Sequence, residues 1–145
     1  CNAGWQDGRS SSTNFRARMA DSRPFTYAVL RVVPCIERGE RLNVGLVLFC
    51  RQHDFLGLET GLNRERLAAI APELDPDPVE ARLEVIRRVI EGDTAAGALA
   101  ELDPSDRFGW LTAPSSTIIQ SSEVHTGLTS DPAAELDRLF KSLVL

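Results

Sequence analysis

The chain has 145 residues, 43% of them hydrophobic, and a formal net charge of −5, which fits one ordinary globular domain. No stretch approaches the ~18 uninterrupted apolar residues of a membrane-spanning helix, and no basic-then-apolar signal opens the chain, so we expect a cytoplasmic protein. The acidic balance and scattered arginines argue against nucleic-acid binding, which needs clustered positive charge.

The three cysteines, Cys1, Cys35 and Cys50, show no paired spacing, which fits neither a disulfide framework nor a zinc site. Cys50 ends an apolar stretch and is expected to be a small buried side chain. Only His53 and His125 can supply imidazole ligands. The sequence therefore predicts no metal ion and no cofactor.

Residues 1–23 differ from the rest of the chain. Residues 1–18 contain Gly, Ser, Asn and Thr without an apolar period, as disordered segments do. Met19 is the only methionine, and the stretch at residues 19–21 resembles a natural start. We expect residues 1–23 to be a disordered leader, either translated upstream sequence or a cloning remnant, and residues 24–145 to form a single domain.

Three strands are predicted in the first part of this domain. Residues 25–33 are rich in aromatic and β-branched side chains and end at Pro34. After a turn at residues 37–40, residues 41–50 form a second strand, so apolar that both of its faces must be buried. Residues 55–59 form a short third strand. Two successive hairpins predict an antiparallel sheet.

Helices are predicted where a capping residue precedes apolar residues at helical spacing. The caps are Asn63, Asp77 and Asp131. Gly92 should end the second helix. A weaker helix is predicted over residues 94–102, a loop closing over the core at residues 108–111, and a fourth strand over residues 117–124. The result is an α+β fold, an antiparallel sheet of about four strands with two or three helices packed mainly on one face.

Four segments stand in a recognisable order: residues 27–31 (YAVLR), 38–45 (RGERLNVG), 114–120 (PSSTIIQ) and 131–140 (DPAAELDRLF). Over about residues 25–145 the chain resembles the bacterial family catalogued as domain of unknown function 3037. The resemblance implies a small bacterial cytoplasmic protein with no assigned activity. Members are often encoded beside proteins that resemble the HipA kinases of toxin–antitoxin systems, which implies an accessory role with a kinase-like protein partner.

Polar side chains gather at the predicted turn between the first two strands. They are Arg31, Glu37, Arg38, Glu40, Arg41 and Asn43. Paired arginines there can clamp a phosphate or carboxylate while Glu40 serves as a base. In the structural alternative, Arg31 and Glu40 form an ion pair that locks the hairpin, and Asn43 donates to a loop carbonyl.

Two further hypotheses are a serine nucleophile and a cation site. Ser115 and Ser116 with His125 lack the G-x-S-x-G elbow of a serine nucleophile, so their hydroxyls are expected to cap backbone groups. The acidic residues Glu73, Asp75 and Asp77 alternate along a turn, and surface turn chemistry explains all three better than a cation site does.

The leading hypothesis is a non-catalytic binding or accessory protein that acts through protein contacts, with a kinase-like partner. Arg31, Arg38, Arg41 and Trp110 are the candidate partner-binding residues, because arginine and tryptophan are enriched at interface centres. The alternative is a small enzyme, a hydrolase or phosphate-ester-binding protein. It requires Arg31, Glu40, Asn43 and His125 to converge in one pocket.

Overall fold

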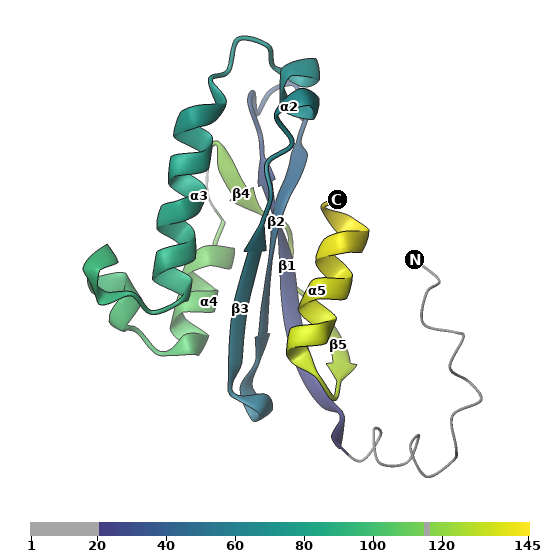
Figure 1. The fold of residues 1–145 in the computed structure, drawn as a ribbon, viewed down its shortest axis with the longest axis vertical. Helices are drawn as coiled ribbons and strands as arrows, with labels where there is room; N and C mark the ends of the chain where they lie inside the picture. Colours follow the sequence, from purple (N-terminus) through teal and green to yellow (C-terminus); the bar gives the residue numbers. More distant parts are fainter. Residues whose placement is uncertain (1–20, 115–116) are drawn as a thin grey trace, which may run out of the picture.

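A computed structural model of the protein describes residues 21–114 and 117–145. Within these residues, one antiparallel sheet has four helices packed against it (Figure 1), which confirms the predicted α+β fold class. The expected leader falls largely outside the described residues, although Arg23 already belongs to the first strand. The strands are β1 (Arg23–Val32), β2 (Leu42–Cys50), β3 (Phe55–Thr60), β4 (Ile119–Ser121) and β5 (His125–Thr129). The helices are α2 (Arg64–Ile70), α3 (Pro76–Ile90), α4 (Pro104–Thr112) and α5 (Pro132–Leu143).

The sheet has the order β3-β2-β1-β4, and β5 pairs with the other half of β1. The β1–β2 hairpin contains a bulge, because Leu30 pairs with Gly45 whereas Arg31 pairs with Asn43. Val44 is therefore the extra residue of β2. A bulge of this kind bends the strand and re-aims the side chains beyond it.

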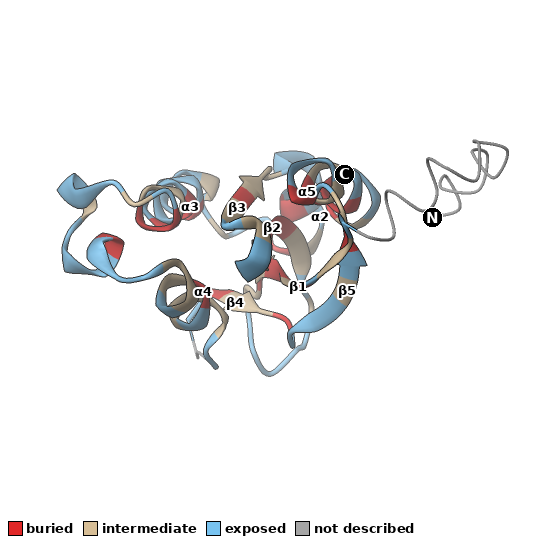
Figure 2. Ribbon diagram, turned by 90° about the horizontal axis from the view of Figure 1, so that it is seen from below, coloured by how far each residue is buried: buried red, intermediate tan, exposed pale blue. Residues whose placement is uncertain are grey.

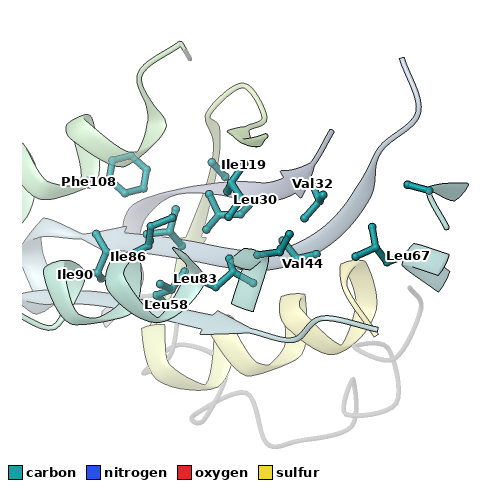
Figure 3. Close-up of a cluster of buried hydrophobic side chains, with 14 residues drawn as sticks. Leu30, Val32, Val44, Leu58, Leu67, Leu83, Ile86, Ile90, Phe108 and Ile119 are labelled. Carbon is teal, nitrogen blue, oxygen red and sulfur yellow. The ribbon is translucent and has the colours of Figure 1, made fainter. Parts of the chain in front are cut away.

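Alternation along β1 sends apolar side chains to both faces of the sheet. Ala28, Leu30 and Val32 join a cluster with side chains of α2, α3 and α4, which Figure 3 shows packed between strands and helices. Phe25 and Val29 join a second cluster with α5. Every residue from 44 to 48 in β2 is buried, as expected for a strand covered on both faces.

The helices are divided between the two faces. Helices α3 and α4 lie on one side of the sheet and α5 lies on the other (Figure 1), and Leu67 of α2 belongs to the cluster that α3 covers. In Figure 2, buried residues occupy the central strands and one side each of α3 and α5, whose other sides are exposed.

One long edge segment differs from the predicted fourth strand. Residues 117–124 were expected to be one strand, but β4 spans only Ile119–Ser121, and β5 (His125–Thr129) follows after a break. At the break, the Ser122 hydroxyl accepts a hydrogen bond from the backbone N–H of Val29 at 2.9 Å. A side chain therefore replaces one backbone bond of the ladder, which a periodicity argument does not anticipate.

Two helical predictions were wrong in detail. Helix α3 is capped by Asp75, which accepts from the N–H of Asp77 at 3.0 Å, rather than by Asp77. The chain repeats the pair Asp-Pro at residues 75–78, and each pair fits a cap followed by proline at the first helical position. The sequence therefore offers two equivalent starts for this helix.

The segment between α3 and β4 also differs. The helix predicted over residues 94–102 is two 3₁₀ segments, Thr94–Ala96 and Ala98–Glu101, because Gly97 adopts φ +115° between them. The loop predicted at residues 108–111 lies inside α4, where Phe108 is buried. Gly109 lowers the helix propensity of that stretch and hides the helix from a sequence argument.

Candidate functional site

Three arginines from separate segments line one hollow of about 400 Å³. Arg31 lies in β1, Arg41 immediately precedes β2, and Arg66 lies in α2. The rest of the lining is one amide and four apolar residues: Asn43, Leu42, Leu143, Val144 and Leu145. We call this hollow the arginine pocket.

The position of the pocket follows from the face of β1 on which Arg31 lies and from the residue at which α5 ends. Arg31 lies two residues beyond Val29 in β1, so both side chains point to the face that α5 covers. Helix α5 ends at Leu143, and its C-terminal end points toward the end of the sheet where α2 lies (Figure 1). The arginine pocket therefore opens where the helical cover of that face stops.

Asn43 links the sheet to α5 at the edge of the pocket. Its Nδ2 donates a hydrogen bond to the carbonyl oxygen of Leu143 at 2.9 Å. Asn43 was expected to bond a loop carbonyl, and the structure gives it a helix carbonyl instead. The C-terminal end of a helix carries about half a negative charge, which favours the nearby arginines.

The three guanidinium groups lack carboxylate partners within the described part of the chain. None of the ion pairs there, with N–O distances up to 4.0 Å, includes Arg31, Arg41 or Arg66. The Nε of Arg31 is buried and has no hydrogen-bond partner among those residues. Burial lowers the pKa of Arg31, and the charge of Arg41 lowers it further, while Glu123 opposes both effects. Arg31 and Arg41 are thus held close enough to repel each other.

Two other residues of the predicted turn cluster lie outside the pocket lining. Glu40 pairs with Arg38 at 3.0 Å, so the predicted ion pair between Arg31 and Glu40 is not formed. Arg38 is 69% exposed and lies with Glu40 in the connection between β1 and β2. A salt bridge this exposed contributes little to stability.

His125 lies in β5, beside a different part of β1 from Arg31. It pairs with Tyr27 across the strands, and the two rings are 5.3 Å apart between centroids. Tyr27 and Arg31 are four residues apart, which is about 13 Å along a strand. The structure therefore brings Arg31, Arg41 and Asn43 together and places His125 away from them.

Trp110 belongs to the opposite face of the sheet. It is half-buried in α4 and packs against the cluster that α3 covers. With Ile119 and Arg82 it lines a separate hollow of about 280 Å³. Of the four partner-binding candidates, Arg31 and Arg41 share one pocket, whereas Arg38 and Trp110 lie elsewhere.

Arg66 was missed by the sequence argument. It is an exposed residue in the first turn of α2, and its backbone N–H donates to the cap Asn63 at 3.0 Å. Nothing in the local sequence separates it from the neighbouring Arg64, which instead pairs with Asp77 and Glu80, each at 2.8 Å. Only the packing of α2 against the sheet distinguishes the two side chains.

The other candidate chemistries find structural explanations where they can be seen. Asp75 caps α3 and Asp77 pairs with Arg64, and the residues in the described ranges include no group of three or more His, Cys, Asp or Glu side chains placed to hold a metal ion. Ser115 and Ser116 lie outside those ranges. Cys50 is fully buried, as predicted.

Comparison with known proteins gives the family but no activity. Neither a curated protein nor a solved structure matches the chain significantly. Among residues 21–114 and 117–145, no helix has the length and apolar character needed to cross a membrane. One family model, described as a protein of unknown function (DUF3037), matches residues 27–144. The chain therefore belongs to the DUF3037 family.

Proposed function

We propose that this protein is a non-catalytic accessory protein that binds a protein partner, and that the arginine pocket receives an anionic group of that partner. The observation that carries the proposal is the composition of the pocket lining. It combines Arg31, Arg41 and Arg66 with one amide and four apolar residues. Arginine is the side chain best suited to bidentate recognition of carboxylates and phosphates.

The same lining supports binding rather than catalysis. General acid–base catalysis needs a group that gains and loses a proton near neutral pH. Arginine does not lose its proton in proteins, and none of the eight described residues that line the pocket has a carboxylate, imidazole, thiol or hydroxyl side chain. An anion in this pocket can be held and oriented by the residues around it, but they supply no base or nucleophile to attack it.

The enzyme alternative requires a base at the pocket. Glu40 is paired with Arg38, and the His125 ring packs against Tyr27, away from Arg31 on β1. A phosphate-ester hydrolase built on Arg31 and Asn43 would need one of these side chains to move into the arginine pocket. The binding function requires no such movement.

A kinase-like protein is the partner that the family resemblance points to. We propose testing it by co-expressing the full chain with the product of the adjacent gene and measuring the affinity of the two purified proteins by calorimetry. We expect one stoichiometric complex that the double variant Arg41→Gln/Arg66→Gln weakens at least about tenfold, since each arginine contributes a charge-assisted hydrogen bond.

The matched control is Arg138→Gln. Arg138 is an exposed arginine of α5 that pairs with Glu135, and it does not line the arginine pocket. This variant changes the net charge by the same amount per site and should leave the affinity unchanged. Absence of a complex, or a complex that tolerates the double variant, would refute the proposed function.

A further inference from the structure

We propose that the arginine pocket is a phosphate site, and that its ligand is a phosphate monoester dianion. This inference deepens the proposed function and rests on it for the identity of the site. It adds the chemical class of the bound group. Three properties of the pocket support a phosphate ligand: its charge, its geometry and its volume.

The charged side chains that line the pocket are all cationic. Three arginines line the hollow, and the C-terminal end of α5 offsets about half a charge. Glu123 is near enough to act on Arg31 but does not line the hollow. The lining side chains therefore favour an anionic ligand. A phosphate monoester carries about −1.5 to −2 at neutral pH, whereas a carboxylate carries a single negative charge.

The geometry also favours a tetrahedral oxyanion. Arg31, Arg41 and Arg66 come from a strand, from the residue before the next strand and from a helix, so the pocket is lined by arginines of three separate backbone segments. A phosphoryl group presents three terminal oxygens in three directions and accepts from several arginines at once.

The volume indicates that the ligand is more than a bare ion. One water molecule accounts for about 30 Å³ in the liquid, so a hollow of about 400 Å³ has room for a phosphoryl group together with the group that carries it. The apolar lining residues Leu42, Leu143 and Val144 provide a surface for that carrier. The carrier is either a phosphorylated side chain of a protein or a small phosphate ester.

Calorimetry on the full chain tests the ligand class with four probes. These are N-acetyl-phosphoserine amide, N-acetyl-serine amide, N-acetyl-glutamate amide and inorganic phosphate. We expect the phosphorylated probe to bind at least about tenfold more tightly than the serine and glutamate probes, which corresponds to one charge-assisted hydrogen bond. Equal affinity for the phosphorylated and glutamate probes would overturn the inference.

Acidification gives an independent readout. The second pKa of a phosphate monoester is about 6, so the dianion is lost as the pH falls from about 7.5 to about 5, whereas arginine side chains keep their charge in proteins. We expect the affinity for the phosphorylated probe to fall over this range and that for the glutamate probe to stay nearly constant. A pH-independent affinity for the phosphorylated probe would contradict the dianion.

Substitutions of the lining arginines test whether phosphate binds in the arginine pocket. Arg41→Gln and Arg66→Gln, both of exposed residues, should each weaken phosphate binding about tenfold or more without unfolding the protein, and Arg138→Gln should not. Arg31→Lys should retain part of the affinity, because the charge stays but the planar fork is lost. Binding that survives Arg41→Gln and Arg66→Gln would overturn the inference.

Two further comparisons identify the source of the phosphate and separate the phosphate inference from the proposed function. A phosphoserine peptide of the partner that binds more tightly than inorganic phosphate identifies a phosphorylated protein, and equal affinities identify a small phosphate. If the protein binds no phosphate but its partner complex is weakened by Arg41→Gln, only the phosphate inference is refuted. Phosphate binding with an insensitive partner complex refutes the proposed function alone.

Discussion

Asn43 in β2 and Leu143 at the end of α5, one hundred residues apart in the chain, are joined by a hydrogen bond of 2.9 Å from Nδ2 to the carbonyl oxygen. This bond ties the β1–β2 hairpin to the C-terminal end of the helix that covers one face of the sheet. Both residues line the arginine pocket. The contact that closes the fold at this end therefore also shapes the candidate site.

Replacing Asn43 with alanine tests this role. Asn43→Ala should lower the free energy of unfolding by about 0.5–1.5 kcal/mol, the net contribution of one such hydrogen bond. Urea unfolding followed by circular dichroism measures the change. The exposed amide Gln52 provides the control, since Gln52→Ala should leave the stability within about 0.5 kcal/mol. A stability loss equal to that of the control would show that the Asn43 bond does not hold α5.

Ser122 offers a second test, at the break between β4 and β5. The side chain is buried, accepts from the N–H of Val29 at 2.9 Å and donates to the carbonyl of Glu123 at 2.9 Å. Ser122→Ala would leave the Val29 N–H unpaired in the core, and should cost about 1–3 kcal/mol. Ser121→Ala removes a hydroxyl that only donates to a carbonyl and should cost less. Equal losses would contradict the proposed ladder role.

Gly92 and Arg107 are coupled at the end of α3. Gly92 adopts φ +78°, and a Cβ there would lie 2.7 Å from Nη1 of Arg107, which donates to the carbonyl of Ile90 at 2.9 Å. Gly92→Ala should cost about 1–2 kcal/mol from the left-handed backbone alone, and displacing Arg107 adds to it. The same change at Gly109 in α4, where a Cβ meets nothing within 4 Å, should stabilise the protein by about 0.5–1 kcal/mol.

A double-mutant cycle separates the two contributions at Gly92. If Arg107→Ala has already removed the clash, Gly92→Ala should cost less in that background than in the natural one. Additive losses would show that backbone strain accounts for the whole effect. Thermal unfolding of the four proteins is sufficient for the comparison.

The link between α2 and α3 predicts a pH dependence. The Arg64 side chain holds the pKa of Glu80 below its usual value. Because the pKa is depressed in the folded state, the stabilisation is present above the unfolded pKa of Glu, about 4.3, and is lost as the pH falls through the lower folded value. Arg64→Gln should therefore destabilise the protein more at neutral pH than at about pH 3, by a small amount because the pair is exposed. Urea unfolding at the two pH values measures it, and a constant effect would contradict the link.

Arg31 should cost stability in the absence of a ligand. Arg31→Met removes a partly buried charge that repels Arg41 and retains most of the side-chain volume, so the free protein should be unchanged or up to about 1 kcal/mol more stable. The same substitution at Arg87, whose guanidinium donates to Thr60 Oγ1 at 2.8 Å, should destabilise. Urea unfolding in phosphate-free buffer makes the comparison. A clear loss at position 31 would show that its guanidinium supports the fold.

Local signals were sufficient for most elements of the fold. The β1–β2 hairpin, the short β3, the cap Asn63 and helix α5 all lie where periodicity and capping residues predict them. The predicted bounds were wrong where two signals compete, as at the repeated Asp-Pro pairs before α3. They were also wrong where glycine weakens a helix, as at Gly109 in α4. The break at Ser122 was missed because a side chain there completes a backbone ladder between segments 93 residues apart.

The candidate site was predictable only in part. Arg31, Arg41 and Asn43 were singled out because polar residues interrupt an apolar hairpin, and they do share one pocket. Glu40 was grouped with them by its place in the predicted turn and His125 by residue type, and the structure gives both of them other neighbours. Chemical character indicates what a side chain can do but does not place its partners.

The amino-acid sequence by itself determined the α+β class, the two-sided burial of β2 and the family, because each follows from local composition and order. Only the tertiary structure decided that Arg66 joins Arg31 and Arg41 while Arg64 does not. It also decided that α5 ends beside Asn43, so that the pocket opens there. These relationships depend on packing between residues distant in the chain, which hydrophobic periodicity and capping signals do not encode.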